Sequence, residues 1–170
     1  DEIGEMGLSL QVKLRRVLQE RAFERVGGNR TIQVDVRIVA ATNQDLESLV
    51  EEKRFRQDLF YRLNVIPIVI PPLRERRSDI PLLIDHFLAR FNQTKHTAIS
   101  GIEPDALRLL ANYDWPGNIR ELENMVERLV VLKKQGRLLV SDLPEKICRK
   151  QAAPELTEQF IQFSEDGINL

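Results

Sequence analysis

The stretch RIVAATNQDLESLVEEKRFRQDLFYRLNVIPIVIPP, residues 37–72, decides the fold class. It begins and ends with short apolar runs rich in β-branched residues, at 37–41 and 65–70. Such runs are typical of strands, and the first suits a strand that is buried on both faces of a parallel sheet. Between them, residues 44–52 and 55–63 have the pattern of two helices. This alternation of strand and helix predicts an α/β sheet.

The residues before this stretch predict a helix followed by a hairpin. Apolar residues recur every three or four positions over 8–21, which indicates an amphipathic helix with Ser9 as its N-cap. Two β-prone runs, 23–26 and 31–36, flank residues 27–30, whose two glycines and asparagine favour a tight turn.

The residues after 76 predict an all-helical region. The composition shifts near residues 74–78, and apolar residues then recur at helical spacing. We therefore divide the chain into an α/β part, 1–76, a helical part, 77–150, and a polar linker, 151–170, with Phe160 and Phe163 as docking points. The predicted helices are 80–91, 103–112, 118–134 with Asn118 as its cap, and a short one near 143–149, with 93–101 as a polar loop.

The composition limits the class of protein. The chain has 170 residues, 42% of them apolar, and a net charge of −1, which fits one folded domain with at most a small satellite. Its single cysteine excludes an intramolecular disulfide framework. The longest uncharged stretch, 63–73, is shorter than the roughly 20 residues of a membrane-spanning helix, so we expect a cytoplasmic protein without a membrane partner. Because residue 1 is Asp rather than Met, we expect a piece of a longer protein.

Two pairs of polar residues fall where ligands bind in α/β sheets. Asp1 and Glu2 are adjacent carboxylates before a glycine turn, and they lie at the carboxyl end of a strand if one precedes them. There an Asp can hold Mg²⁺ and a Glu can orient water; the alternative is a solvated pair. Thr42 and Asn43 follow the predicted strand 37–41 and can touch a phosphate, or Asn43 caps the next helix.

Arginine accounts for 18 of the 25 cations. Its planar fork grips phosphate or carboxylate at two points. Arg56 and Arg62 lie six residues apart, so on one helix their side chains do not stack on one face. They could still project from the same edge of a subunit; the alternative is salt bridging, with Asp58 as the partner for one of them.

Arg120 lies in the first turn of a predicted helix. A cation is unfavourable there because the amino end of the helix dipole is positive. An anion shared between the helix start and the guanidinium would relieve this conflict. The alternative is an ion pair with Glu121 or Glu123.

Other familiar sites are not indicated. His86 and His96 have no cysteine or carboxylate at ligand spacing, so we predict no zinc site. Cys148 has no local partner for nucleophilic catalysis. The sequence holds no GxxxxGK[ST] phosphate-binding loop.

Seven segments carry a family resemblance. They are DEIGEM, QVKLRRVLQE, FERVGG, VDVRIVAATNQDL, FRQDLFYRLNV, PPLRERRSDIPLL and WPGNIRELEN. In this order they resemble the AAA+ domain of bacterial sigma-54-dependent activators, the enhancer-binding proteins, from Asp1 to about Lys150. The resemblance implies a partial Rossmann-like AAA+ base followed by an all-helical lid subdomain, which agrees with the α/β and helical parts read above.

The resemblance also implies roles in ATP hydrolysis. Asp1 would bind Mg²⁺ and Glu2 would polarise the attacking water, because the two match the end of the Walker B motif. Thr42 and Asn43 match the sensor I position. Residues 27–30 match the tip of a hairpin insertion that couples hydrolysis to the loop that contacts sigma-54.

The arginines match positions that read the nucleotide. Arg56 and Arg62 match the arginine fingers, which are offered to ATP on the neighbouring subunit of a ring, commonly a hexamer. Arg120 matches sensor II in the lid. ATP and Mg²⁺ are therefore the expected ligands of the complete domain.

Other parts of the family's machinery fall outside these residues. The Walker A loop and the GAFTGA loop that touches sigma-54 belong upstream, and the helix-turn-helix domain for enhancer DNA belongs downstream. We expect the parent protein to remodel the closed promoter complex of the sigma-54 RNA polymerase holoenzyme, and this chain alone to be inactive. The alternative is a non-catalytic assembly or interaction module derived from an AAA+ protein.

Overall fold

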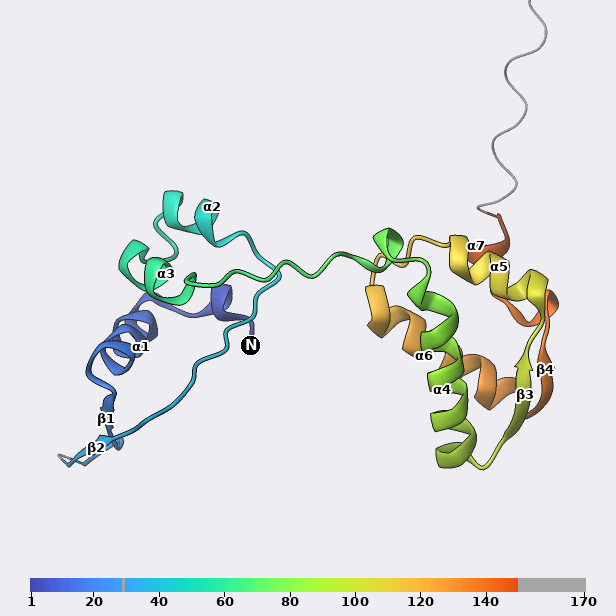
Figure 1. Ribbon diagram of the computed structural model, residues 1–170, viewed down its shortest axis with the longest axis horizontal. Coiled ribbons are helices and arrows are strands. Elements are labelled where there is room, and N and C mark those ends of the chain that lie inside the picture. Colours follow the sequence, from blue (N-terminus) through green and yellow to red (C-terminus); the bar gives the residue numbers. More distant parts are fainter. Residues whose placement is uncertain (29, 150–170) are drawn as a thin grey trace, which may run out of the picture. The chain divides into compact units, whose positions relative to one another are not determined.

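The computed structural model describes residues 1–28 and 30–149, which form two compact units that divide after Val69 (Figure 1). The predicted linker, 151–170, and its docking points lie outside the described residues. The predicted boundary after residue 76 stays a prediction. Within the described residues, no helix is long and apolar enough to cross a membrane.

The first unit packs three helices around a small apolar core, and a β-hairpin follows the first helix (Figure 1). Leu59, Phe55 and Phe60 from the third helix and the segment before it form the centre of this core. In chain order its elements are η1 (Ile3–Glu5), α1 (Leu8–Glu20), β1 (Ala22–Glu24), β2 (Thr31–Gln33), α2 (Leu46–Glu51) and α3 (Gln57–Leu63).

The helix α1 confirms the predicted helix, but its start and its buried face differ. Its N-cap is Gly7, with no side-chain hydrogen bond, so the prediction that Ser9 caps it is wrong. Leu10, one of the apolar residues that recur at helical spacing, is 52% exposed, whereas Gln11 is fully buried. The helix ends at Arg21, whose φ of 49° lies in the left-handed region.

The predicted hairpin is confirmed, with shorter strands. β1 and β2 are antiparallel, and Phe23 lies opposite Ile32. Gly27 in the turn has a φ of +77°, a conformation that L side chains rarely adopt. The glycine of the sequence pattern is therefore needed for the turn.

The second unit is a helical bundle with a small sheet beside it (Figure 1). The helices α4 and α6 pack against each other, and Ile84, Trp115 and Leu122 are fully buried between the elements. In chain order these elements are η2 (Leu73–Glu75), α4 (Asp79–Lys95), β3 (Ala98–Ile102), α5 (Pro104–Asn112), α6 (Asn118–Lys133), β4 (Gln135–Leu138), η3 (Val140–Asp142) and α7 (Glu145–Cys148).

The parallel pair of β3 and β4 corrects the prediction of an all-helical second half. Ile99 lies opposite Gly136. Residues 93–101, predicted as a polar loop, instead complete α4 and then enter β3. Asn92 fixes the start of β3, because its amide donates to Ile99 O at 2.8 Å and accepts from Ile99 N at 3.0 Å. Helices combined with strands, including a parallel pair, confirm the α/β class.

The two strands predicted at 37–41 and 65–70 do not form. A strand needs a neighbour that takes its backbone hydrogen bonds. In the described part of the chain, however, the strands pair only as β1 with β2 and β3 with β4. Both runs are therefore irregular, and their side chains stay exposed, with Val39 at 83% and Val69 at 88%. The expectation that 37–41 is buried on both faces is wrong for this structure.

Trp115 lies at the centre of the second unit and is the only tryptophan of the chain. Its Nε1 donates to Leu110 O at 2.8 Å, so its polar atom is satisfied although the residue is fully buried. Its ring meets that of Tyr113 edge to face, with centroids 5.1 Å apart. Tryptophan fluorescence therefore reports on the second unit alone.

We predict that Leu122→Ala destabilises the second unit by about 2–5 kcal/mol, since a fully buried side chain leaves a cavity. Leu132→Ala is the matched control, because Leu132 lies on the same helix and is 69% exposed; it should change the free energy of unfolding by less than about 0.5 kcal/mol. Urea unfolding followed by Trp115 fluorescence measures both variants. Equal losses would contradict the described packing.

Candidate functional site

Asp1 and Glu2 directly precede a turn, Ile3–Glu5, that contacts Ala41 and Thr42. The backbone N–H of Ile3 donates to Ala41 O at 3.1 Å. Both carboxylates are exposed, and so are the side chains of residues 42 and 43. The structure therefore brings the backbone segments that carry the two polar pairs next to each other, although 37–41 is not a strand.

Thr42 lies against Gly4. A Cβ added at Gly4 would stand 3.0 Å from Thr42 Oγ1 and 2.9 Å from Gln44 Oε1, so the missing side chain permits this close approach. Thr42 Oγ1 also accepts the N–H of Gln44 at 3.1 Å. The cap of α2 is Asp45, whose carboxylate accepts a backbone N–H of the first turn at 3.1 Å. The alternative that Asn43 caps this helix is therefore wrong.

Arg56 is held by an ion pair with Asp58. Its Nε and Nη2 donate to the two carboxylate oxygens at 3.0 and 2.8 Å. The hydrogen bond from Arg56 lowers the pKa of the Asp58 carboxyl below its ordinary value. Arg15 approaches the same carboxylate from α1, with its Nε 3.6 Å from Asp58 Oδ2. The alternative of a salt bridge with Asp58 is thus confirmed for Arg56, and its phosphate role stays a prediction.

Arg62 is exposed, and among residues 1–28 and 30–149 it has no ion pair and no side-chain hydrogen bond. It lies in the last turn of α3, where the helix dipole favours a cation. Arg56, by contrast, is the N-cap of α3 and has an extended backbone. The premise that both arginines lie within one helix is therefore wrong, and they stand at its opposite ends.

Gln11 is a residue of this site that the sequence analysis missed. It is fully buried on α1, where its Nε2 donates to Met6 O at 2.6 Å and to Arg54 O at 3.0 Å. Its Oε1 accepts the backbone N–H of Arg56 at 2.8 Å. The available signal was a polar residue three positions before Leu14, on the apolar face of the helix. Gln11 ties the segment before α3 to α1.

In the second unit, the turn before α6 is built around Gly117 and Asn118. The N–H of Asn118 donates to Trp115 O at 2.7 Å, and its side-chain oxygen accepts from Leu73 N at 2.8 Å. Asn118 therefore ties η2 to α6, and the prediction that it caps the helix is wrong. The N-cap of α6 is Gly117, and Glu121 Oε2 accepts its backbone N–H at 3.0 Å. A Cβ at Gly117 would stand 2.8 Å from Glu121 Cβ, so this position needs glycine.

Arg120 is exposed and has no ionic partner in the part of the chain that the structure describes. Glu121 accepts from Lys146 Nζ at 2.8 Å instead, and Glu123 pairs with Arg90. Neither of the two ion pairs considered for Arg120 from the sequence therefore forms, and that alternative is wrong. Its charge stands in the first turn of α6, where a lone cation is unfavourable.

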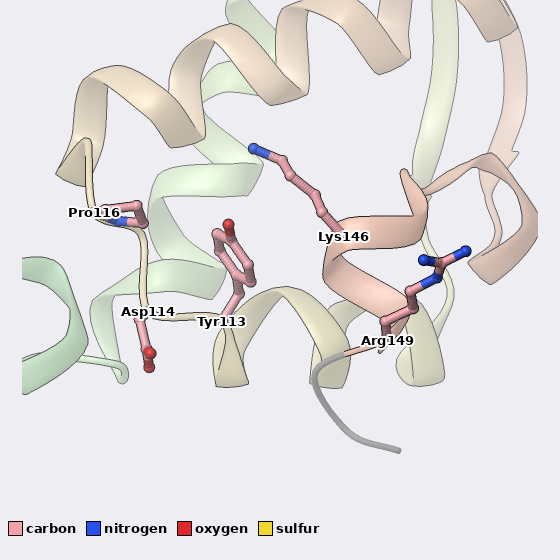
Figure 2. Close-up of a pocket in the computed structure, with 5 residues that line it drawn as sticks. All are labelled: Tyr113, Asp114, Pro116, Lys146 and Arg149. Carbon is pink, nitrogen blue, oxygen red and sulfur yellow. The ribbon is translucent and has the colours of Figure 1, made fainter. Parts of the chain in front are cut away.

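A hollow of about 470 Å³ opens in the second unit beside α7 (Figure 2). Figure 2 shows Tyr113 and Lys146 extending in one direction and Asp114 in the opposite one. Lys146 Nζ lies 5.6 Å from the centre of the Tyr113 ring, and Asp114 pairs with Arg77 at 3.0 Å. Because its charged side chains already have ionic partners, we assign this hollow no ligand. Its lining, which does not include Arg120, is Tyr113, Asp114, Pro116, Lys146 and Arg149.

Among the described residues, no three His, Cys, Asp or Glu side chains lie close enough together to enclose a metal ion. Magnesium is commonly held by one or two carboxylates, with water completing its shell. The exposed pair of Asp1 and Glu2 is chemically suited to this kind of site.

Two family models match the chain. Residues 1–69 match the Sigma-54 interaction domain, and residues 74–160, about half of the chain, match the AAA+ ATPase lid domain. The chain belongs to the sigma-54 activator family of AAA+ proteins. The resemblance read from the sequence is confirmed, and so is the order of an AAA+ base followed by a lid.

Relatives from this family have similar sequences. The regulatory protein AtoC of Escherichia coli K12 is 56% identical over 147 residues, which is 86% of this chain and 32% of that protein. The transcriptional regulatory protein ZraR of Salmonella typhimurium is 53% identical over 158 residues, 93% of this chain and 35% of that protein. The structure of NtrX from Brucella abortus in complex with ATP has a TM-score of 0.81 at 40% identity, covering 94% of this chain and 37% of that one. The chain thus spans about a third of the length of these relatives.

We predict that Glu121 makes the stability of the lid pH-dependent. Burial raises the pKa of its carboxyl, but hydrogen bonds from Lys146 and the Gly117 N–H outweigh burial and leave it below the ordinary 4.5. The stabilisation is therefore complete above pH 4.5 and is lost as the pH falls through the lower folded-state value. Trp115 fluorescence in urea should show a less stable lid below pH 4.5, and Glu121→Gln should flatten this dependence.

The control for this experiment is Glu145→Gln, because the Glu145 side chain is 79% exposed on α7. It should leave the pH dependence of the lid unchanged. If Glu121→Gln and the unaltered chain lose stability with the same slope, the assigned role of Glu121 is wrong.

Proposed function

We propose that this chain forms part of the ATPase domain of a sigma-54-dependent transcription activator, which uses ATP hydrolysis to remodel the closed promoter complex. The observation that carries the proposal is the hydrogen bond from Ile3 N to Ala41 O. It joins the segment that carries Asp1 and Glu2 to the segment that carries Thr42. Side chains of these types can hold a metal, orient water and touch a phosphate. NtrX of Brucella abortus is described in complex with ADP and with ATP, which supports ATP as the substrate.

Asp1 would hold Mg²⁺, and Glu2 would orient the attacking water. Their exposed carboxylates are the hard oxygen ligands that Mg²⁺ takes. Once bound, the ion supplies positive charge to the phosphate oxygens. The backbone beside them is anchored, because the next residue, Ile3, is buried and its N–H donates to Ala41 O at 3.1 Å.

Thr42 and Asn43 would read the phosphate from the adjacent segment. The hydroxyl oxygen of Thr42 accepts the Gln44 N–H, which leaves its own O–H proton to donate. Asn43 is exposed and does not cap α2. Both side chains are therefore available to a phosphate oxygen beside the two carboxylates.

Arg56 and Arg62 would act on ATP that is bound by the neighbouring subunit of a ring. An arginine supplied in this way stabilises the charge of the transferring phosphoryl group. Arg62 is ready for this role, since it is exposed and has no partner among the described residues. Arg56 must first leave Asp58, and Arg15, 3.6 Å from that carboxylate, can then neutralise it.

Arg120 would sense the nucleotide from the lid, since its unfavourable charge at the start of α6 is relieved by a bound phosphate. Residues 1–69 match the Sigma-54 interaction domain, which supports the sigma-54 RNA polymerase holoenzyme as the partner. For the complete protein we propose a hexameric ring that acts at enhancer DNA. The remainder of that protein would supply the phosphate-binding loop GxxxxGK[ST], which these 170 residues do not contain.

In the complete protein, Arg62→Ala should keep its affinity for ATP and lose about 10³-fold or more in hydrolysis. Arg62→Lys keeps the charge but loses the planar guanidinium, so its rate of ATP hydrolysis should stay well below that of the unaltered protein. Mixing Arg62→Ala with Glu2→Ala should restore part of the activity, because each variant supplies at some interfaces what the other lacks. Phosphate release across mixing ratios measures this.

A mixture that stays inactive at every ratio would count against action between subunits. A complete protein that binds ATP and assembles but never hydrolyses it would favour the alternative, a non-catalytic module. The ATP affinity and the oligomeric state of each variant are measured alongside, so that a folding defect is recognised.

Arg120→Ala in the complete protein should weaken ATP binding about tenfold or more, the effect of losing a charge-assisted hydrogen bond. Without nucleotide its stability should be unchanged or slightly higher, since no described carboxylate pairs with Arg120 and its charge at the start of α6 is unfavourable. Arg128→Ala, also exposed on α6, is the matched control and should alter neither quantity. A steep loss of stability with unchanged ATP affinity would instead show a structural role.

A further inference from the structure

The backbone N–H of Arg56 is bound by a distant side chain. Arg56 is the N-cap of α3, and its N–H donates to the side-chain oxygen of Gln11 at 2.8 Å, across 45 positions of sequence. The amide nitrogen of Gln11 donates to Met6 O and Arg54 O at 2.6 and 3.0 Å. The amide therefore uses its acceptor and both of its donors, although the residue is fully buried.

Two of these three hydrogen bonds fall on either side of Phe55. Phe55 is 2% exposed and anchors the same segment in the core of the first unit. The chain entering α3 is thus fixed at Arg54, Phe55 and Arg56 in succession. The guanidinium of Arg56 binds the Asp58 carboxylate. When it leaves that carboxylate, only the side chain moves, because Gln11 holds the backbone of Arg56 in place.

We propose that Gln11 is a positioning residue for the arginine finger Arg56, an inference that rests on the proposed function of Arg56. Gln11 sets the point from which the guanidinium reaches toward the ATP of the neighbouring subunit. Reacting groups need tight placement, and an error of about 1 Å can cost about 100-fold in rate. Gln11 touches no substrate and acts through the backbone of Arg56.

The bond to Met6 leaves a second route open, because Met6 ends the turn that carries Glu2. Through that bond Gln11 could act on the carboxylates of its own subunit rather than on the finger. We favour the finger, because two of the three hydrogen bonds hold the segment that leads into α3. The experiment is designed to separate the two routes.

The test uses the complete protein with Gln11→Met, which keeps the length of the side chain and removes all three hydrogen bonds. We expect ring assembly and ATP affinity to persist, while kcat falls about 10–100-fold. Lys13→Met, exposed on the same helix, is the control and should retain full activity. Leu14→Ala, which loosens the same core, should lower the melting temperature without this fall in kcat. An equal fall in kcat for Leu14→Ala, or loss of assembly or ATP affinity in Gln11→Met, would overturn the proposal.

Mixed rings identify the side of the interface on which Gln11 acts. Gln11→Met with Glu2→Ala should recover hydrolysis, since one variant keeps its carboxylates and the other keeps its finger. Gln11→Met with Arg56→Ala should not recover, because both lack a working finger. Recovery with Arg56→Ala but not with Glu2→Ala would overturn the proposal and place the effect at the subunit's own carboxylates.

The mixture of Arg56→Ala with Glu2→Ala separates this inference from the proposed function. If that mixture is inactive at every ratio, the finger assignment itself fails. If it recovers while Gln11→Met with Glu2→Ala does not, only the positioning role fails. Should Gln11→Met prove insoluble, Gln11→Asn, which keeps the amide on a shorter side chain, is taken through the same mixtures and judged by the same outcomes.

Discussion

Every backbone N–H and C=O that leaves water needs a hydrogen-bond partner, and the architecture of both units depends on this constraint. Where no helix or strand supplies the partner, a side-chain amide does. Gln11 binds the segment before α3, Asn92 binds the start of β3, and Asn118 binds η2. Gln11 and Asn118 each join segments 45 positions apart in sequence. A buried group left without its partner costs about 1–3 kcal/mol, so each of these amides stabilises the segment that it binds.

The roles of the many arginines differ and depend on the ionic partner of each side chain. Many of these side chains form exposed ion pairs with a nearby carboxylate, such as Arg16 with Glu20, and such pairs contribute about 0–1 kcal/mol. Arg62 and Arg120 differ, because no carboxylate in the described part of the chain pairs with either. The dipole of α3 favours the charge of Arg62, whereas the dipole of α6 opposes that of Arg120. The charge of Arg120 is therefore better suited to a bound anion than to its own surroundings.

Local patterns were sufficient to predict the helices and the hairpin, since residues a few positions apart determine them. Predictions failed where the hydrogen-bond partner of a segment is remote in sequence, or where a remote group takes a hydrogen bond that the local pattern assigns elsewhere. Residues 37–41 have the composition of a strand but no neighbour to pair with, and β3 forms because Asn92 and β4 hold it. Asn118 has the chemistry of a cap, yet its oxygen is taken by Leu73.

The candidate site shows the same limit. The sequence pattern identified Asp1, Glu2 and Thr42, but no spacing rule brings residue 3 within hydrogen-bond distance of residue 41. Gln11 was overlooked because a polar residue on an apolar face reads as a break in the pattern. It is in fact a buried amide with every donor and acceptor used.

The exposed run 65–70 carries a proline at its middle, Pro67, and this sets how the run can associate. Proline has no N–H to donate, so the run cannot be hydrogen-bonded along both of its edges at that position. In any sheet, this run can therefore only be an edge strand. Its apolar side chains, with Ile66 at 79% and Ile68 at 82% exposure, would otherwise invite strand after strand to add. Because of Pro67, such association is self-limiting. Once one strand has paired with the run, no second strand can pair along its other edge, and the sheet cannot grow further through it.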